Sequence, residues 1–205
     1  MYERVLDLGG ETMKGRLLLS LGAICVATGV HAADERKSTQ GMWHQEPASF
    51  IGIQINQNLT YQLNECPTDS VPDRLCYKKA FENYYTLRAV PPLGLHGYSA
   101  SVITHDSQIR EITLTTKIDD YQNIKDLLVR KYGKPQLQGT ETVKTKVGAT
   151  FQNEKLFWEG KSVAILLEKY SDTVDKSSVS VINTVVAVKA KQVEKSLLLN
   201  SASQL

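Results

Sequence analysis

The stretch that decides the fold is residues 98–135, YSASVITHDSQIREITLTTKIDDYQNIKDLLVRKYGKP. Within it, residues 98–103 and 109–116 alternate apolar and polar side chains, which is the period-2 pattern of half-buried strands. The turn-forming sequence His-Asp-Ser-Gln at residues 105–108 lies between them. This combination predicts a β-hairpin.

An amphipathic helix is predicted directly after the hairpin, over residues 119–132. Asp119 and Asp120 supply acidic residues for its first turn, Gly133 stands where a left-handed C-cap belongs, and Pro135 forbids continuation. The apolar residues between these signals recur at helical spacing: Tyr121, Ile124, Leu127, Leu128 and Tyr132.

Working outward, the remaining patterns are short and strand-like. We expect strands near residues 50–55, 59–63, 85–90, 147–151, 155–158, 162–168 and 179–182, and the first two of these resemble a hairpin. The sequence of residues 75–85 predicts either a short helix or a segment whose aromatic side chains pack over the sheet. The order of elements predicts an α+β fold: a mainly antiparallel sheet with one amphipathic helix, at about 119–132, packed on one face.

The chain divides into one domain with flanking segments. We expect a single α+β domain over residues 48–184, and a terminal helix or disordered tail over residues 185–205. Residues 33–47 are polar and charged apart from Trp43, and they predict a flexible leader. No internal repeat is visible in the sequence.

The N-terminal segment has the composition of an export signal. Lys14 and Arg16 precede an apolar stretch over residues 17–27, and Val30-His31-Ala32 ends it. This order predicts a signal peptide over residues 13–32, with cleavage between Ala32 and Ala33. The apolar stretch is shorter than the ~20 residues that a spanning helix needs. Residues 1–12 carry acidic charge where a signal needs positive charge, so we expect translation to start at Met13 and residues 1–12 to be an upstream mis-start.

Two cysteines, Cys66 and Cys76, remain after cleavage. In an exported protein such a pair predicts a disulfide, and the sequence between them is rich in turn-forming residues. The alternative, a redox or metal pair, lacks both a Cys-x-x-Cys motif and a neighbouring histidine. We therefore expect a disulfide-closed loop in a periplasmic or secreted protein.

Charge disfavours a nucleic-acid partner. The chain has a net charge of +2. Removing residues 1–32 takes away three basic and three acidic residues, so the balance does not change. Nucleic-acid binders usually carry a marked basic surplus or stripe.

No catalytic, metal or cofactor motif stands out, and we assign no catalytic, cofactor-binding or metal-ligating residue. The histidines His44, His96 and His105 are scattered, and His105 beside Asp106 fits a turn better than a ligand or base pair. The sequence Gly160-Lys161-Ser162 matches the end of a phosphate-binding loop, but the upstream glycine is missing. Glu159 next to Trp158 is the most suggestive carboxylate for glycosidase chemistry, although we expect it at an exposed turn.

The order of hairpin, helix and strands is similar, at the level of fold only, to small envelope domains such as outer-membrane assembly lipoproteins and β-lactamase-inhibitor proteins. Fold does not imply function. The leading hypothesis is a non-enzymatic exported protein that binds a macromolecular partner in the cell envelope, as adaptor, assembly factor or inhibitor. The alternatives are a hydrolase of an envelope polymer that uses an unlocated carboxylate pair, and a carrier of a small apolar ligand. We expect no membrane span after signal removal.

Overall fold

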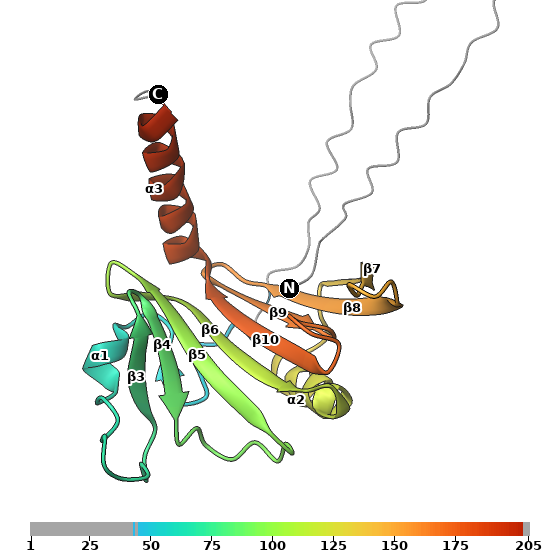
Figure 1. The fold of residues 1–205 in the computed structure, drawn as a ribbon, viewed down its shortest axis with the longest axis horizontal. Helices are drawn as coiled ribbons and strands as arrows, with labels where there is room; N and C mark the ends of the chain where they lie inside the picture. The colour runs from blue at the N-terminus through green and yellow to red at the C-terminus, as the bar shows by residue number, and fades with distance from the viewer. Residues whose placement is uncertain (1–42, 44, 203–205) are drawn as a thin grey trace, which may run out of the picture.

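A computed structural model describes residue 43 and residues 45–202 of the chain. Its centre is an eight-stranded antiparallel sheet in the order β3-β4-β5-β6-β10-β9-β8-β7 (Figure 1). The strands are β3 (Cys76–Phe81), β4 (Tyr84–Arg88), β5 (Tyr98–His105), β6 (Gln108–Lys117), β7 (Leu137–Lys144), β8 (Thr150–Glu159), β9 (Val163–Glu168) and β10 (Lys176–Asn183). The other elements are the hairpin β1 (Ser49–Phe50) and β2 (Ile53–Gln54), and the helices α1 (Leu59–Gln62), η1 (Ile118–Asp120), α2 (Tyr121–Tyr132) and α3 (Thr184–Ala202).

The sheet consists of two halves with the same topology. Each half is a four-stranded antiparallel meander followed by a helix: β3 to β6 and then α2, and β7 to β10 and then α3. The last strands of the two halves, β6 and β10, pair antiparallel at the centre. The sheet therefore has the same strand order from either edge, although the sequence shows no repeat.

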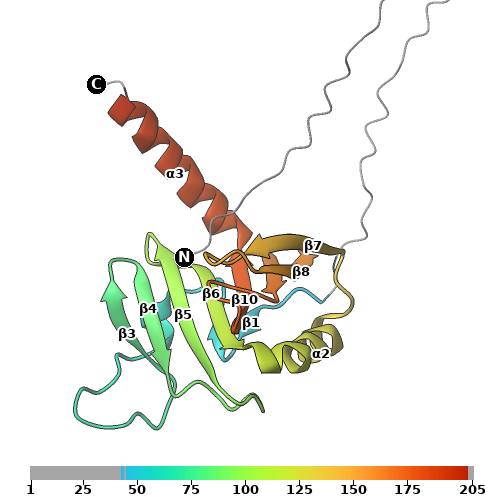
Figure 2. The same ribbon diagram turned by 45° about the vertical axis from the view of Figure 1, so that its right-hand side comes forward.

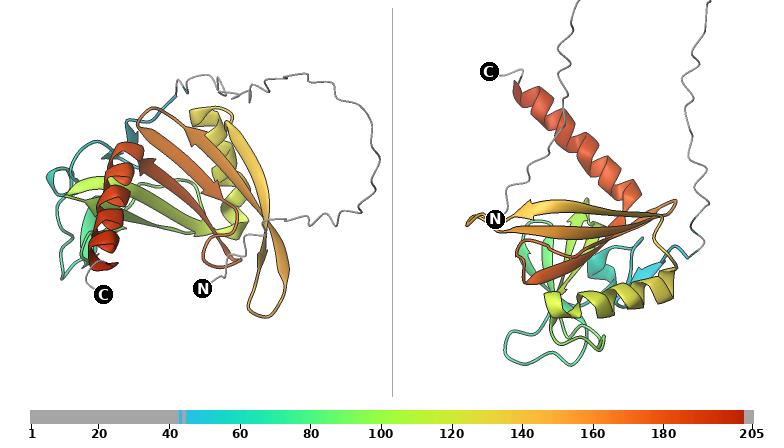
Figure 3. Two further views of the ribbon diagram at one scale, coloured as in Figure 1. Left: turned by 90° about the horizontal axis from the view of Figure 1, so that it is seen from above. Right: turned by 90° about the vertical axis from the view of Figure 1, so that its right-hand side faces the viewer.

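The two helices that follow the halves are placed differently. Helix α2 lies across one face of the sheet below β8, β9 and β10, whereas α3 projects away from the body (Figures 2 and 3). The N-terminal segment of β1, β2 and α1 covers the same face over the other half, where Phe50, Ile53, Ile55 and Leu59 are buried in the core. The strand residues facing these elements include Val102, Ile112, Leu114, Leu156, Trp158, Ile165, Leu167, Val179 and Val181, all fully buried.

The predicted α+β class, the hairpin and the helix are confirmed. Strands β5 and β6 are joined by a two-residue turn in which Asp106 and Ser107 have φ of 49° and 64°. Positive φ at both central positions matches the right-handed twist of the paired strands. The residues Tyr121, Ile124, Leu128 and Tyr132 of α2 are buried, and Gly133 ends the helix with φ of 79°.

The predicted strand at residues 59–63 is wrong, because this segment forms the helical turn α1. The side chain of Gln62 turns back on β2: its Oε1 accepts from the backbone N–H of Gln54 at 2.7 Å, and its Nε2 donates to the carbonyl of Gln54 at 3.0 Å. These two hydrogen bonds use the backbone N–H and carbonyl of Gln54, which are the groups that a third strand would pair with. Leu59, 1% exposed, is buried in the core by the same turn.

Two further expectations need correction. Residues 75–85 contain all of β3 and the start of β4, not a helix, and Tyr77 and Tyr85 contact each other across these strands with ring centroids 5.4 Å apart. The predicted strand at 147–151 is wrong over residues 147–149, which lie in the β7–β8 turn; its last two residues and the predicted strand at 155–158 belong to one strand, β8, whose partner β7 was not predicted. Strand β7 forms an edge of the sheet and is mostly exposed, so its sequence lacks a buried apolar face.

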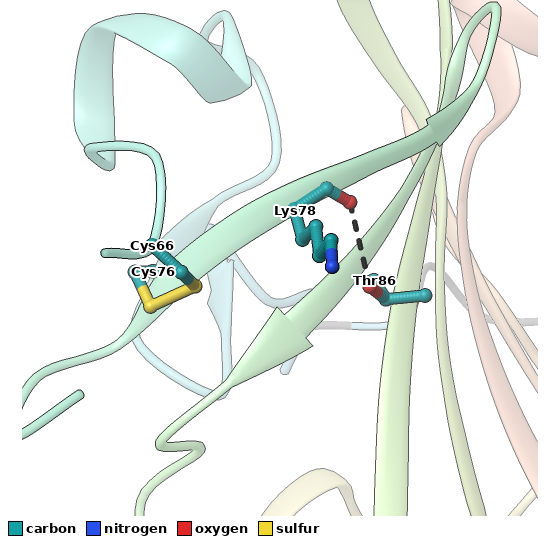
Figure 4. Close-up of a disulfide and its surroundings, with 4 residues drawn as sticks. All are labelled: Cys66, Cys76, Lys78 and Thr86. Carbon is teal, nitrogen blue, oxygen red and sulfur yellow. Dashed lines mark hydrogen bonds between the residues drawn. A yellow bond between two sulfur atoms is a disulfide. The ribbon is translucent and has the colours of Figure 1, made fainter. Parts of the chain in front are cut away.

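The predicted disulfide between Cys66 and Cys76 is present, with a Cα–Cα distance of 5.0 Å. It ties the loop before β3 to the first residue of that edge strand (Figure 4). Backbone bonds extend the attachment, because the N–H of Cys66 donates to the carbonyl of Tyr77 at 2.8 Å and the N–H of Tyr77 donates to the carbonyl of Asn64 at 3.1 Å. Further along the pair, the hydroxyl of Thr86 on β4 donates to the carbonyl of Lys78 at 3.4 Å.

The predicted signal peptide (13–32), its cleavage between Ala32 and Ala33, the upstream residues 1–12 and most of the predicted leader lie outside the described residues. At the described end of the leader, Trp43 is buried and packs on Tyr132. Among the helices that the structure describes, none combines the length and apolar character needed to cross a bilayer. Where we expected a terminal helix or a disordered tail, the structure has helix α3 over Thr184–Ala202.

Removing the disulfide with the double substitution Cys66→Ser and Cys76→Ser is expected to lower the free energy of unfolding by about 2–3 kcal/mol, because the crosslink closes a short loop in the unfolded chain. Urea unfolding followed by circular dichroism measures the difference. Adding a thiol reductant to the unsubstituted protein should reproduce the loss and should leave the variant unchanged. Equal stability with and without reductant would show that the loop gains nothing from the crosslink.

Candidate functional site

The candidate site is an open groove of about 580 Å³ on the face that carries α2. Three segments that are distant in the sequence form its walls: the β1–β2 turn, the loop before β5, and α2. Its lining is mainly apolar, and two exposed cations lie on α2 at its rim. The residues are Ser49, Phe50, Ile51, Gly52, Pro91, Pro92, Leu93, Leu114, Ile124, Leu127, Leu128, Arg130, Lys131 and Tyr132.

The first wall, the β1–β2 turn, holds a residue in an unfavourable backbone conformation. Ile51 has φ of 45°, and Gly52 beside it has φ of 88°. A glycine adopts this left-handed region freely, but a β-branched residue there is an outlier that costs about 1–3 kcal/mol. The turn thus holds a half-buried isoleucine at the edge of the groove, against its backbone preference.

The second wall is the loop of residues 89–97, which is attached at two points. Near its start, the hydroxyl of Tyr98 donates to the carbonyl of Pro91 at 2.9 Å. Near its end, the backbone N–H of His96 donates to Oδ2 of Asp120 at 2.8 Å, and Nδ1 of His96 lies 2.8 Å from Oδ1 of the same carboxylate. These bonds connect the loop to the first turn of α2, so that two walls of the groove share one anchor.

Asp120 is the centre of this anchor. Its side chain is fully buried, whereas the His96 side chain is 77% exposed. Burial raises the pKa of the Asp120 carboxyl, but the hydrogen bonds from His96 and Asn123 outweigh it, so the pKa lies below the ordinary 3.8. The Asp120 carboxylate binds the loop and does not cap α2. No side-chain cap hydrogen bond forms at the N-terminus of this helix.

The third wall, α2, is fastened to the sheet along its length. At its start, Glu154 of β8 accepts from the hydroxyl of Tyr121 at 2.6 Å and from Nζ of Lys125 at 2.9 Å. Burial and the neighbouring carboxylate raise the pKa of Tyr121, so the phenol stays protonated. At its end, Nε1 of Trp158 donates to the carbonyl of Gly133 at 2.8 Å.

Trp43 and Glu46, at the described end of the N-terminal segment, bind the C-terminal end of α2 and the β8–β9 turn. Nε1 of Trp43 donates to the carbonyl of Tyr132 at 2.8 Å. The carboxylate of Glu46 then accepts from the backbone N–H groups of Lys161, Ser162 and Val163 at 2.6–2.9 Å. Burial raises the pKa of this carboxyl, and these bonds together with the Ser162 hydroxyl outweigh it and lower the pKa.

Residues Gly160-Lys161-Ser162 form the turn between β8 and β9, and the backbone N–H groups of Lys161 and Ser162 hold the chain's own Glu46 carboxylate. A side chain at Gly160 would collide with Glu46, because an added Cβ would lie 2.5 Å from the carboxyl carbon. A larger residue at this position would have to displace the Glu46 carboxylate from these hydrogen bonds.

The structure keeps the other residues singled out in the sequence apart from the groove. His105 and Asp106 lie at the β5–β6 turn, where Oδ2 of Asp106 is 3.6 Å from Nε2 of His105 and 2.8 Å from Nζ of Lys189 on α3. Trp158 is fully buried, while its neighbour Glu159 is exposed. His44 lies outside the described residues.

Within the described part of the chain, no three His, Cys, Asp or Glu side chains come close enough together to hold a metal ion. The chemistry that the groove offers is the burial of apolar groups beside positive charge. Its rim carries Arg130 and Lys131, and no residue of its lining is acidic. Tyr132 adds a buried hydroxyl that has no hydrogen-bond partner among the described residues.

Sequence reasoning missed the groove, although two of its signals were visible. The apolar face of α2 is wider than burial against the sheet requires, and it leaves Leu127 38% exposed. Pro91 and Pro92 mark a rigid, exposed loop next to a strand. Nothing in the sequence shows that these two segments and Ile51 meet, because their contact is tertiary.

Comparison of the chain with protein-family models, curated proteins and solved structures gives no significant match.

Substituting Asp120→Asn is expected to lower the free energy of unfolding at neutral pH by about 1.5–3 kcal/mol, the usual contribution of hydrogen bonds to a charged group. Because the folded-state pKa of Asp120 lies below the ordinary 3.8, the contribution is fully present above that value and is lost as pH falls below it. The difference between the two proteins should therefore be constant from pH 7 to about pH 5 and shrink at lower pH. Urea unfolding at a series of pH values measures it.

Asp119→Asn is the matched control, because Asp119 is the exposed neighbour of Asp120. Its effect should stay within about 0.5 kcal/mol at every pH. If both substitutions had the same effect, the loop anchor would contribute nothing to stability.

Proposed function

We propose that this protein binds a segment of another protein in the groove, as an exported adaptor, assembly factor or inhibitor. The observation that carries the proposal is an open apolar groove of about 580 Å³ with a strained isoleucine at its edge. Exposed apolar concavities rimmed by polar residues are typical of binding surfaces.

The lining supports an occupant with apolar side chains. Ile51 and Leu93 are partly accessible to solvent although both pack against the buried core, and Leu127 beside them is exposed. A few large side chains inserted into such a pocket supply most of the binding free energy of a protein interface. An open groove also accepts a chain that continues beyond it on either side.

The rim supports an occupant with acidic residues. Arg130 and Lys131 are exposed at the end of α2, and no carboxylate lines the groove to neutralise them. Complementary charge at a rim favours the rate of association and the choice of partner more than affinity. A partner segment with apolar anchors and flanking aspartate or glutamate fits this distribution.

The conformation of Ile51 supports binding rather than stability as the reason for the turn. Strained backbone persists where the surrounding structure enforces it, and such positions cluster at functional sites. Asparagine at position 51 would accept the same backbone with less strain. A sequence selected for stability alone would have little reason to keep isoleucine there.

Export is the second component of the proposal. The Cys66–Cys76 disulfide is compatible with an oxidising compartment. The periplasm or the extracellular space follows from the predicted signal peptide over residues 13–32, which remains a prediction.

An apolar small molecule is the second candidate occupant. The volume of the groove, about 580 Å³, lies within the range of small-molecule sites, about 300–1,000 Å³. Native mass spectrometry of the purified protein would reveal a copurified ligand of this kind as a constant mass increment.

A photoreactive amino acid at position 131, on the rim, should form one dominant protein adduct in the cell envelope. Combining it with Ile51→Asn should reduce the yield of the adduct at least ten-fold, because the apolar side chain is lost. The thermal midpoint of this variant should not fall, because asparagine relieves the strained turn. Immunoblotting of the adduct and a thermal unfolding curve give the two readouts.

Position 147 is the control for the photoreactive amino acid, because Val147 is 92% exposed at the tip of the β7–β8 hairpin, outside the groove. It should not give the same adduct. Equal adducts from positions 131 and 147, or an adduct that Ile51→Asn leaves unchanged, would rule out the groove as the binding site.

A further inference from the structure

Helix α3 has a fixed base and an unsupported end. At the base, Val186 and Ala190 are 5% and 4% exposed, and Lys189 forms an ion pair with Asp106 of the β5–β6 turn at 2.8 Å. The side chain of Asn183 also accepts from the backbone N–H of Val186 at 3.2 Å. From residue 191 to residue 198 every side chain is exposed, and the helix projects away from the sheet (Figures 1 and 3).

The unsupported end combines leucines with lysines. Leu197 and Leu198 are 60% and 71% exposed. Consecutive residues of a helix point about 100° apart, so these two leucines make more than one side of the helix apolar. Lys191 and Lys195 precede them and Glu194 is the single acidic residue in this part, so residues 191–198 carry a net charge of +1.

We propose that the end of α3 binds the surface of an anionic lipid bilayer, with Leu197 and Leu198 in the interfacial region and Lys191 and Lys195 at the headgroups. The spacing fits this arrangement, because Lys195 and Lys191 lie about 4.5 and 10 Å along the helix from Leu198. Lysine side chains at these depths reach the headgroups with their ammonium groups while their stems stay in apolar surroundings.

Pairing with the α3 of a second copy fits the sequence less well. Helical pairing requires apolar heptads sustained over at least about three repeats. The unsupported part, residues 191–202, is 12 residues long, which is less than two heptads. Leu198 also lies off the stripe that Val193 and Leu197 would present to a partner helix, and two lysines in each copy would repel each other.

The placement of α3 has a consequence for the groove. Helix α2 lies on the side of the sheet away from the direction in which α3 projects (Figures 1 and 3). A bilayer bound by the end of α3 would therefore leave the groove facing the aqueous compartment. This inference does not depend on what the groove binds.

The test is flotation of the full chain with lipid vesicles. Vesicles with 30% phosphatidylglycerol in phosphatidylcholine serve as the anionic probe, and vesicles of phosphatidylcholine alone serve as the neutral one. Lys191→Ala with Lys195→Ala should lower binding to anionic vesicles about 25-fold, since each lysine near an anionic surface contributes a factor of about five. Leu197→Ser with Leu198→Ser should lower it at least ten-fold. All variants share one N-terminus, so differences between them report on α3.

The matched control is Lys144→Ala with Lys146→Ala, which removes the same charge from exposed positions around the β7–β8 turn. This variant should bind like the unsubstituted protein, and circular dichroism should be the same for all variants. Equal losses from the two lysine pairs, no preference for anionic vesicles, or a dimer in sedimentation equilibrium that Leu197→Ser with Leu198→Ser dissociates would each overturn the proposal.

Discussion

The antiparallel pairing of β6 with β10 is the contact on which the rest of the structure depends. Seven residue pairs, from Lys176 with Lys117 to Ile182 with Glu111, join two meanders that would otherwise be separate four-stranded sheets. Because β10 occupies the edge of β6, the chain that leaves β6 must reach the far edge of the sheet before it returns. Helix α2 makes that crossing, and it covers one half of the sheet as it does so. The other half is covered by the N-terminal hairpin and α1.

The groove lies where these coverings meet, and its geometry follows from their anchors. Asp120 holds the loop of residues 89–97 to the first turn of α2, Glu154 holds α2 to β8, and Glu46 holds the N-terminal segment to the β8–β9 turn. Each carboxylate has a lowered pKa because its hydrogen bonds outweigh its burial. Three hydrogen-bonded carboxylates, of which Asp120 is buried and the other two are partly exposed, therefore fix the segments around the groove. Binding sites on rigid elements of this kind need little reorganisation when a partner arrives.

The sequence predicted the elements whose signals are local. The helix over 119–132, the β5–β6 hairpin and the disulfide each had cap, turn or cysteine signals within a few residues. The prediction of a strand at 59–63 was wrong because the side chain of Gln62 binds the backbone of Gln54. This contact is tertiary, and the alternation of five residues does not reveal it. Strand β7 was not predicted because this edge strand is mostly exposed and its sequence lacks the apolar alternation of a half-buried strand. The groove could not be predicted, since Ile51, Pro91 and Leu127 are distant in the sequence and come together only in the tertiary structure.

The most direct test of the groove as the binding site is hydrogen exchange of backbone amides, compared between the protein alone and the purified photo-crosslinked adduct. Added protection is predicted in the three walls, at residues 49–52, 93–97 and 124–132, with little change in β3, β4 and β7. Protection confined to the edge strands or to α3, with the three walls unchanged, would contradict the account.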